Sequence, residues 1–389
     1  MRFPEFGGDW KMERLDEIAT LSKGIGISKE ELSDDGEPCI LYGELYTKYK
    51  SEIINEIYSK TDIDNSKLKR SNANDVIIPC SGETAEDIAT ARCIPFDNIL
   101  LGGDLNIISL HQHNGAFMSY QLNGKRKFDI ARVAQGVSVV HLYGEHLKAI
   151  MTYNPCLQEQ QKIAKLLSLI DERIATQNKI IDKLQSLIKG LVDELMTVLL
   201  KGKLYPFSSF YIKAGEGGTP TTSVVEYYTE GTIPFIKIED LSCKYLTNNK
   251  DFITELGMQK SSAWLIPSKS VIYSNGATIG AISINEYPVC TKQGILGIVP
   301  NTNINVEYLY LLMSSSYFSK EISRIITEGT MKTAYLKDIN HIKCPLPSMA
   351  QQKNITNLTS SIEEKLSIEQ ELLRFLNLQK QYLLHMMFI

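Results

Sequence analysis

The feature that most constrains this chain is a long helical segment that the sequence contains twice. Residues 155–174 read PCLQEQQKIAKLLSLIDERI, and residues 347–366 read PSMAQQKNITNLTSSIEEKL. The two copies align without a gap at a constant shift of 192 residues, so that Gln160 falls on Gln352. A chain of 389 residues that repeats nearly half its length predicts two similar domains, each followed by a similar helix.

Both repeated segments have the apolar spacing of a coiled coil. Apolar side chains recur mostly at alternating intervals of three and four residues, from Ile163 to Val198 in the first copy and from Ile355 to Met387 in the second. A proline opens each segment, as is common in the first turn of a helix. About 40 residues at a rise of about 1.5 Å each predict helices about 60 Å long.

The two segments that precede the helices have diverged but keep one plan. Short apolar runs alternate with turn residues, as in residues 76–78 of the first copy and 271–273 of the second, which predicts short strands with tight turns. We therefore predict an α+β fold with two pseudo-symmetric globular domains separated by two long antiparallel coiled-coil helices. The predicted boundaries are 1–152, 153–202, 203–345 and 346–389.

The composition of the chain restricts the classes of protein to which it can belong. The net charge of −4 argues only weakly against a nucleic-acid ligand, because acidic helices can outweigh a local basic face. The seven cysteines are scattered without a CxxC pair, so the sequence predicts neither a disulfide framework nor a zinc site. No apolar run reaches the roughly 18 residues of a membrane span, and no signal peptide is evident, so we expect a cytoplasmic protein.

The predicted architecture resembles a caliper. Two globular domains on a rigid antiparallel helix pair are held at a fixed distance and rotation. A protein that reads two separated half-sites on one DNA duplex needs this geometry, because the helical phase of the DNA sets where the second half-site faces. Diverged domains on similar helices suit two different half-sites.

Several motifs make the chain similar to a known family. They are Phe3-Pro4-x-Phe6, Trp10-Lys11, Pro155-x-x-x-Glu159-Gln160-x-x-Ile163, the segment LLSLIDERI at 166–174, Gly217-Gly218-Thr219-Pro220 and the segment GATIG at 276–280. With these motifs the chain resembles, over essentially its whole length, the specificity subunit of type I restriction–modification systems. It departs from the pattern in two places, because the second domain lacks a counterpart of Trp10 and Gln351 stands where the first copy has Glu159.

The resemblance implies a role in a DNA-modifying complex. Each globular domain would be a target recognition domain that reads one half of a bipartite site in double-stranded DNA. The helices would set the spacer and dock two methyltransferase subunits and, for cleavage, endonuclease subunits that translocate DNA. S-adenosylmethionine would bind the methyltransferase, which makes N6-methyladenine, and ATP and Mg would bind the endonuclease. This chain would hold no cofactor.

The residues themselves argue against catalysis by this chain. Residues 153–156 read YNPC, which lacks the second proline and the aromatic residue of the Asn-Pro-Pro-Tyr motif of adenine methyltransferases. No GxxxxGK[ST] phosphate loop occurs, and His111-x-His113 lacks the further ligands of a metal site. Two alternatives stay open, a non-catalytic coiled-coil scaffold for protein partners and, less favoured, a self-sufficient nuclease or methyltransferase.

Candidate contact residues follow from polarity and position. A solvated loop is the plain alternative for any basic run, but basic residues near the helices are predicted to contact phosphates. These are Lys125, Arg126, Lys127, Arg132, Lys320, Arg324 and Lys332. Predicted base-edge readers are Tyr42, Ser81, Glu83, Lys237, Asn275, Lys292 and Gln293. Predicted partner-binding residues on the helices are Glu159, Gln160, Asp171, Arg173, Gln352, Glu363 and Lys365.

Overall fold

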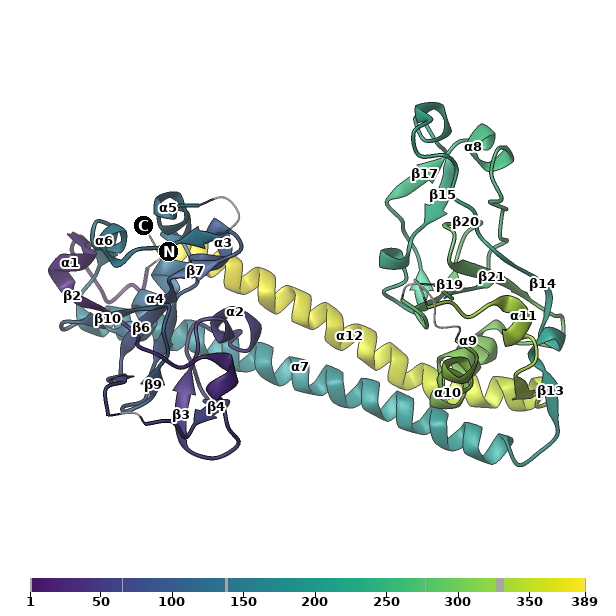
Figure 1. The fold of residues 1–389 in the computed structure, drawn as a ribbon, viewed down its shortest axis with the longest axis horizontal. Helices are drawn as coiled ribbons and strands as arrows, with labels where there is room; N and C mark the ends of the chain where they lie inside the picture. The colour runs from purple at the N-terminus through teal and green to yellow at the C-terminus, as the bar shows by residue number, and fades with distance from the viewer. Residues whose placement is uncertain (1, 65, 137–138, 277, 327–331, 389) are drawn as a thin grey trace. The chain divides into compact units, whose positions relative to one another are not determined.

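A computed structural model describes residues 2–64, 66–136, 139–276, 278–326 and 332–388 (Figure 1). Its longest elements are the helices α7 (Leu157–Leu199) and α12 (Met349–Met387). The contacts divide the chain into two compact units. The first unit is Met1–Lys179 with Gln370–Ile389, and the second unit is Ile180–Glu369. Each unit therefore combines a globular domain with parts of both long helices.

The first unit contains two four-stranded sheets and two strand pairs. The central sheet is antiparallel and has the order β2 (Ala19–Lys23), β10 (Leu105–Leu110), β6 (Asp75–Pro79), β8 (Arg92–Ile94). The second sheet has the order β4 (Ser59–Thr61), β3 (Glu37–Ile40), β9 (Leu100–Leu101), β5 (Lys69–Arg70), and β3 runs parallel to β9. The pairs join β1 (Lys11–Arg14) to β12 (Met151–Asn154) and β7 (Ser81–Gly82) to β11 (Val140–His141).

Short helices connect these strands. Helix α4 buries Phe117, Met118 and Leu122, which fixes it between the central sheet and the long helices. The short helices are α1 (Leu15–Ile18), α2 (Glu44–Thr47), α3 (Ala85–Ile88), α4 (Gly115–Asn123), α5 (Lys127–Val133) and α6 (Gly144–Lys148), with a 3-10 turn at Lys29–Glu31.

The second unit repeats this plan with a larger sheet. Its main sheet has the order β14 (Tyr211–Glu216), β21 (Ile295–Pro300), β18 (Val271–Ser274), β19 (Ile282–Asn285), β16 (Tyr245–Leu246). A three-stranded sheet has the order β17 (Asp251–Ile253), β15 (Ile233–Ile236), β20 (Cys290–Thr291), and β13 (Leu204–Pro206) pairs with β22 (Lys343–Pro345). Its helices are α8 (Glu255–Gln259), α9 (Val306–Ser314), α10 (Ser316–Ile325) and α11 (Leu336–Ile339), with 3-10 turns at Phe207–Ser209, Val225–Tyr227 and Ile238–Asp240.

The two globular domains share the strand order of their main sheets. The order β2-β10-β6-β8 matches β14-β21-β18-β19, and every pairing in both is antiparallel. In the smaller sheets, β3 and β15 each have one antiparallel and one parallel neighbour. The apolar runs at 76–78 and 271–273 are the buried strands β6 and β18. The predicted α+β fold with two pseudo-symmetric domains is confirmed.

The two long helices run antiparallel. In the first unit, Ile163 and Leu167 near the start of α7 share a core with Leu383 and Met387 near the end of α12. In the second unit the correspondence is reversed, because residues near the end of α7 share a core with Ile355 near the start of α12. Each shared core also includes residues of the globular domain, so the helices belong to both hydrophobic cores.

Candidate nucleic-acid interface

A buried glutamine fastens the start of α7 to the first globular domain. Gln160 accepts a hydrogen bond at Oε1 from the backbone amide of Asn114, at 2.9 Å, and its Nε2 donates to the carbonyl of Pro155, at 2.9 Å. Asn114 is the N-cap of α4 and accepts from the amide of Phe117. Since both polar ends of Gln160 are satisfied inside the protein, this side chain fixes the angle between α4 and α7.

The repeat builds the same joint in the second unit. Gln352 accepts from the backbone amide of Asn305, the N-cap of α9, at 2.7 Å, and its Nε2 donates to Pro347 at 2.9 Å. A second acceptor for the same Nε2 is the carbonyl of Asn303, at 3.0 Å. The matched glutamines that the 192-residue shift pairs are therefore structural joints in each unit.

Four of the seven predicted partner-binding side chains are inside the protein. Glu159, Gln160 and Gln352 are at most 1% exposed, and Asp171 is 8% exposed. The carboxylate of Glu159 accepts hydrogen bonds from Nε and Nη2 of Arg2, each at 2.7 Å. A docking partner could reach these four groups only by breaking their internal contacts, and their role in partner binding stays a prediction.

The other three predicted partner-binding residues are more accessible. Arg173 and Lys365 are exposed, and Lys365 forms an ion pair with Glu369 one turn along α12. Glu363 is half-buried and holds the ammonium of Lys244 at 2.6 Å. Arg173 and Lys365 stay predictions for the helix surface.

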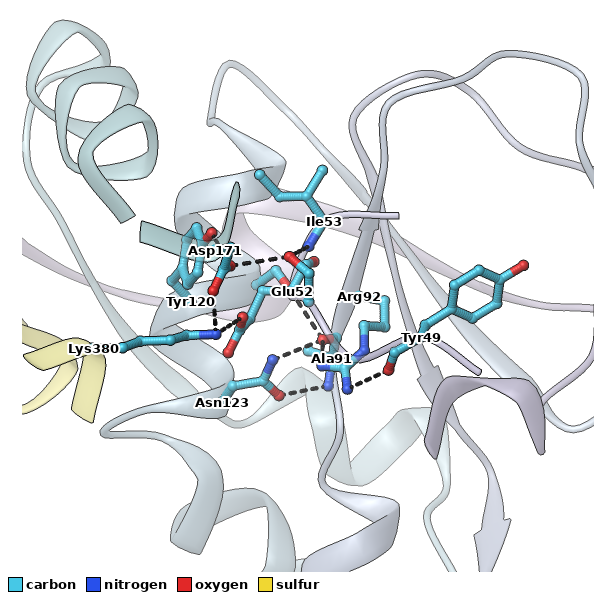
Figure 2. A network of polar contacts seen from close by, with 11 residues as sticks. Tyr49, Glu52, Ile53, Ala91, Arg92, Tyr120, Asn123, Asp171 and Lys380 are labelled. Atoms are coloured by element: carbon cyan, nitrogen blue, oxygen red, sulfur yellow. Dashed lines mark hydrogen bonds and ion pairs between the residues drawn. The ribbon is translucent and has the colours of Figure 1, made fainter. Parts of the chain in front are cut away.

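A buried network of charges ties the end of α12 to the first globular domain and to α7 (Figure 2). The ammonium of Lys380 lies between the carboxylates of Glu52 and Asp171, with 2.7 Å to Asp171 Oδ1. Asp171 Oδ2 also accepts from the hydroxyls of Tyr120, at 2.6 Å, and Ser51, at 3.0 Å. The network accounts for the burial of Asp171.

Electrostatics in this network favour a charged lysine. Burial alone lowers the pKa of Lys380, but the carboxylates of Glu52 and Asp171 outweigh burial and raise it above the ordinary value. Nearby, Arg92 donates to the carbonyls of Ala91 and Tyr49, and burial lowers the pKa of Arg92. Sequence reasoning missed this network, because Glu52 and Lys380 are 328 residues apart in the chain.

The predicted DNA-contacting residues of the first domain differ in accessibility. Arg132 has 79% of its side chain exposed, whereas Arg126 has 17% and lies 5.2 Å from the centre of the Tyr153 ring. Both arginines face Asp129. Lys125 and Lys127 are half-buried at the start of α5. Arg132 is therefore the most accessible cation of this group.

The predicted base readers of the first domain also differ in solvent exposure. Tyr42 and Glu83 are exposed. Ser81 is 8% exposed, and its hydroxyl donates to Asp104 Oδ2 at 3.1 Å. Because this hydroxyl is already bonded inside the domain, Ser81 is less accessible than Tyr42 and Glu83, and its contact with a base stays a prediction.

In the second domain most predicted contacts are on the surface. Lys292, Gln293, Lys320 and Lys332 are exposed, as is Arg324, which pairs with Glu321. Lys237 is half-buried and holds Asp251 at 2.9 Å.

Asn275 is the exception. This side chain is 1% exposed, and its Nδ2 donates to the carbonyl of Ala334 at 3.1 Å. At this depth the side chain is not on the surface of the domain, and the prediction that Asn275 reads bases has no support from its position. Asn275 instead fixes the backbone before α11.

Two other sequence expectations concern ligands and membranes. Within the described ranges, no three His, Cys, Asp or Glu side chains gather as metal ligands would. His111 contacts the hydroxyl of Thr20 at 2.9 Å and His113 contacts Gln160 at 3.0 Å, so both histidines have structural partners. No helix in the described part of the chain is long and apolar enough to cross a bilayer.

The sequence matches one family twice. The family is described as a type I restriction modification DNA specificity domain, and the matched segments are residues 7–186 and 210–377. Each segment contains one globular domain and part of the long helix that follows it.

Curated relatives carry related names. The type I restriction enzyme MjaVIII specificity subunit of Methanocaldococcus jannaschii is 25% identical over 401 residues, which covers 95% of this chain and 89% of that protein. The EcoR124I/EcoR124II specificity subunit of Escherichia coli is 28% identical over 52% of this chain and 55% of that protein. The MjaIX specificity subunit of M. jannaschii is 30% identical over 38% of this chain and 35% of that protein. Thus the match spans about half or less of the last two relatives.

Solved structures share the fold. The S subunit of a type I restriction-modification system from M. genitalium matches with a TM-score of 0.61 and 19% identity, over 100% of this chain and 99% of that chain. A chain from a structure titled for complex assembly and conformational transition of the type I R-M system matches with a TM-score of 0.58 and 15% identity, over 98% and 97%. At these identities the likeness establishes the fold.

Proposed function

The chain belongs to the family of type I restriction–modification DNA specificity subunits, and on this premise we propose that it selects the DNA site for a methyltransferase complex. Each globular domain reads one half of a bipartite site in double-stranded DNA. The observation that carries this proposal is the repeated domain, with one strand order in both copies, built onto two antiparallel helices. A rigid helix connection sets the spacing between two half-sites.

The proposal assigns catalysis to other subunits. Two methyltransferase subunits dock on the helices and carry S-adenosylmethionine, and endonuclease subunits carry ATP and Mg for translocation and cleavage. The chain acts by positioning DNA, for which its accessible cations are suited, because phosphate contacts fix register without reading sequence. The residues proposed for these contacts are Lys125, Arg126, Lys127, Arg132, Lys320, Arg324 and Lys332.

A binding and methylation assay tests the proposal. The purified chain, the methyltransferase alone and the two together are each given a duplex that contains the site and radiolabelled S-adenosylmethionine. We expect a sequence-specific gel shift and methyl transfer only when both proteins are present. Methyl transfer by this chain alone would show a self-sufficient enzyme. A stable complex that never shifts a duplex would instead identify a protein-binding scaffold.

A further inference from the structure

An exposed tyrosine occupies the same repeat position in both domains. Tyr143 precedes α6 and Tyr335 precedes α11, and the two are separated by the 192 residues that relate the long helices. Both are 46% exposed. A large aromatic side chain left in solvent at one position in two diverged domains calls for a shared ligand rather than a shared core.

The backbone around each tyrosine is held in the same way. In the first domain, Asn106 donates its Nδ2 to the carbonyl of Leu142 at 3.0 Å. In the second domain, Asn275 donates to the carbonyl of Ala334 at 3.1 Å. Leu142 and Ala334 directly precede the tyrosines, and each asparagine is 1% exposed. Asn106 lies in β10, whereas Asn275 directly follows β18, so residues at different places in the two sheets produce one arrangement.

A lysine ammonium lies over each tyrosine ring. Lys23 of β2 is 5.9 Å from the ring centre of Tyr143, and Lys337 of α11 is 5.6 Å from that of Tyr335. These distances are within the range of a cation–π contact. Both lysines are exposed. Each site therefore offers a phenol hydroxyl and an ammonium as donors.

The surroundings of Tyr143 form a small hollow of about 230 Å3. Lys23, Lys148, Asn106 and Glu145 are among its lining residues, and Glu145 neutralises Lys148 at 2.7 Å. The charged lining residues sum to one net cation, and Ser22 and Tyr143 add hydroxyl groups that can donate, which suits an anionic group such as a phosphodiester.

The ring of Tyr143 already has partners on its faces and edge, which argues against base stacking on this tyrosine. Lys23 covers Tyr143, and the imidazole of His141 stacks near it at 6.2 Å with an interplanar angle of 28°. His146 meets the same ring edge-on at 5.6 Å. What remains available on Tyr143 is its hydroxyl group.

We propose that Tyr143 with Lys23, and Tyr335 with Lys337, are equivalent contacts to the DNA phosphate backbone, one on each domain. They hold either domain on its half-site irrespective of base sequence, which explains why the feature persists while the domains diverge. The inference rests on the proposed function, because it takes DNA as the ligand. Phosphate contacts of this kind position a protein without specifying bases.

Salt-dependent binding by the complex with methyltransferase subunits tests the inference. Lys23→Ala and Lys337→Ala should each weaken binding by about tenfold, to specific and unrelated duplexes alike. Each should also reduce the slope of log K against log salt by about 0.9, the value for one lost phosphate contact. The double variant should show about twice this reduction, and Tyr143→Phe and Tyr335→Phe should weaken binding with little change in slope.

Matched controls separate the outcomes. Lys23→Arg should retain the parental slope. Lys269→Gln removes an exposed lysine that is already paired with Glu286, and it should change neither affinity nor slope. Parental binding by all four variants would overturn the inference, as would a change in the preferred base at one position. If the unaltered complex binds no duplex, the proposed function is overturned and the inference with it. This outcome is recognised because the control variants then also bind no duplex.

Discussion

Replacing Lys380 by methionine should lower the free energy of unfolding of the first unit more than the loss of an exposed lysine does. The side chains of Lys380, Glu52 and Asp171 are 14%, 9% and 8% exposed, so the value for a buried ion pair applies rather than the small value for a surface pair. Removing one member of a buried pair leaves an uncompensated charge and costs about 3–5 kcal/mol. We expect the free energy of unfolding of the first unit to fall by about that amount.

The tryptophans allow the two units to be followed separately. The chain has two tryptophans, and Trp10 packs edge-on against Phe117 and Phe388 at the junction of the first domain with α12. In a Trp264→Phe background, urea unfolding followed by tryptophan fluorescence reports on the first unit. The matched control is Lys165→Met, which replaces an exposed lysine of α7 within the first unit, and we expect it to cost less than about 0.5 kcal/mol.

Lowering the pH should restore part of the stability that Lys380→Met loses. Burial raises the pKa of Glu52, and Lys380 is the main group that opposes this rise, so its removal favours the protonated carboxyl further. A folded-state pKa above the unfolded value gives stability that is present at low pH and lost as the pH rises. The deficit of Lys380→Met should therefore shrink from about pH 8 to about pH 5. Equal losses for the two lysine variants, or a deficit that grows on acidification, would refute the reasoning.

Three further changes test other joints of the fold. Gln352→Ala leaves the amide of Asn305 without its buried acceptor and should cost the second unit about 1–3 kcal/mol, measured by urea unfolding with Trp264 as the probe. Phe388→Ala removes a ring that is 3% exposed and packs on Trp10, so the first unit should lose about 3–5 kcal/mol in the Trp264→Phe background. Gly217→Ala would place a methyl group 2.1 Å from the carbonyl oxygen of Thr291, and circular dichroism should show a lower melting temperature than for Gly190→Ala, where nothing lies within 4 Å. Unchanged stability in any of the three would show that the contact is dispensable.

The long helices could be predicted from sequence because their signals are periodic and repeated. The expected segment begins at Pro155, and α7 begins at Leu157. The order of the strands in each sheet was harder to predict from sequence. In the first domain, for example, β10 lies between β2 and β6, which are distant in sequence. Strand order depends on long-range contacts that one chain's local pattern does not encode.

The candidate site was harder to predict because polarity does not reveal burial. Asn275 and Ser81 have the side chains of base readers, yet both are bonded inside their domains. Asp171 was expected on the helix surface but belongs to a network completed by residues of another helix and another domain. The sequence holds one further signal for the site. The 192-residue shift extends upstream of the helices and pairs Tyr143 with Tyr335.

The central claim is that this chain specifies a bipartite DNA site through its two domains. Mapping N6-methyladenine across a host genome that carries the methyltransferase, with this chain present, absent, or with residues 203–345 replaced by those of another family member, tests it most directly. The account predicts one split motif that disappears without the chain, and a new second half with an unchanged first half after the replacement. A methylation pattern that is the same in all three strains would contradict it.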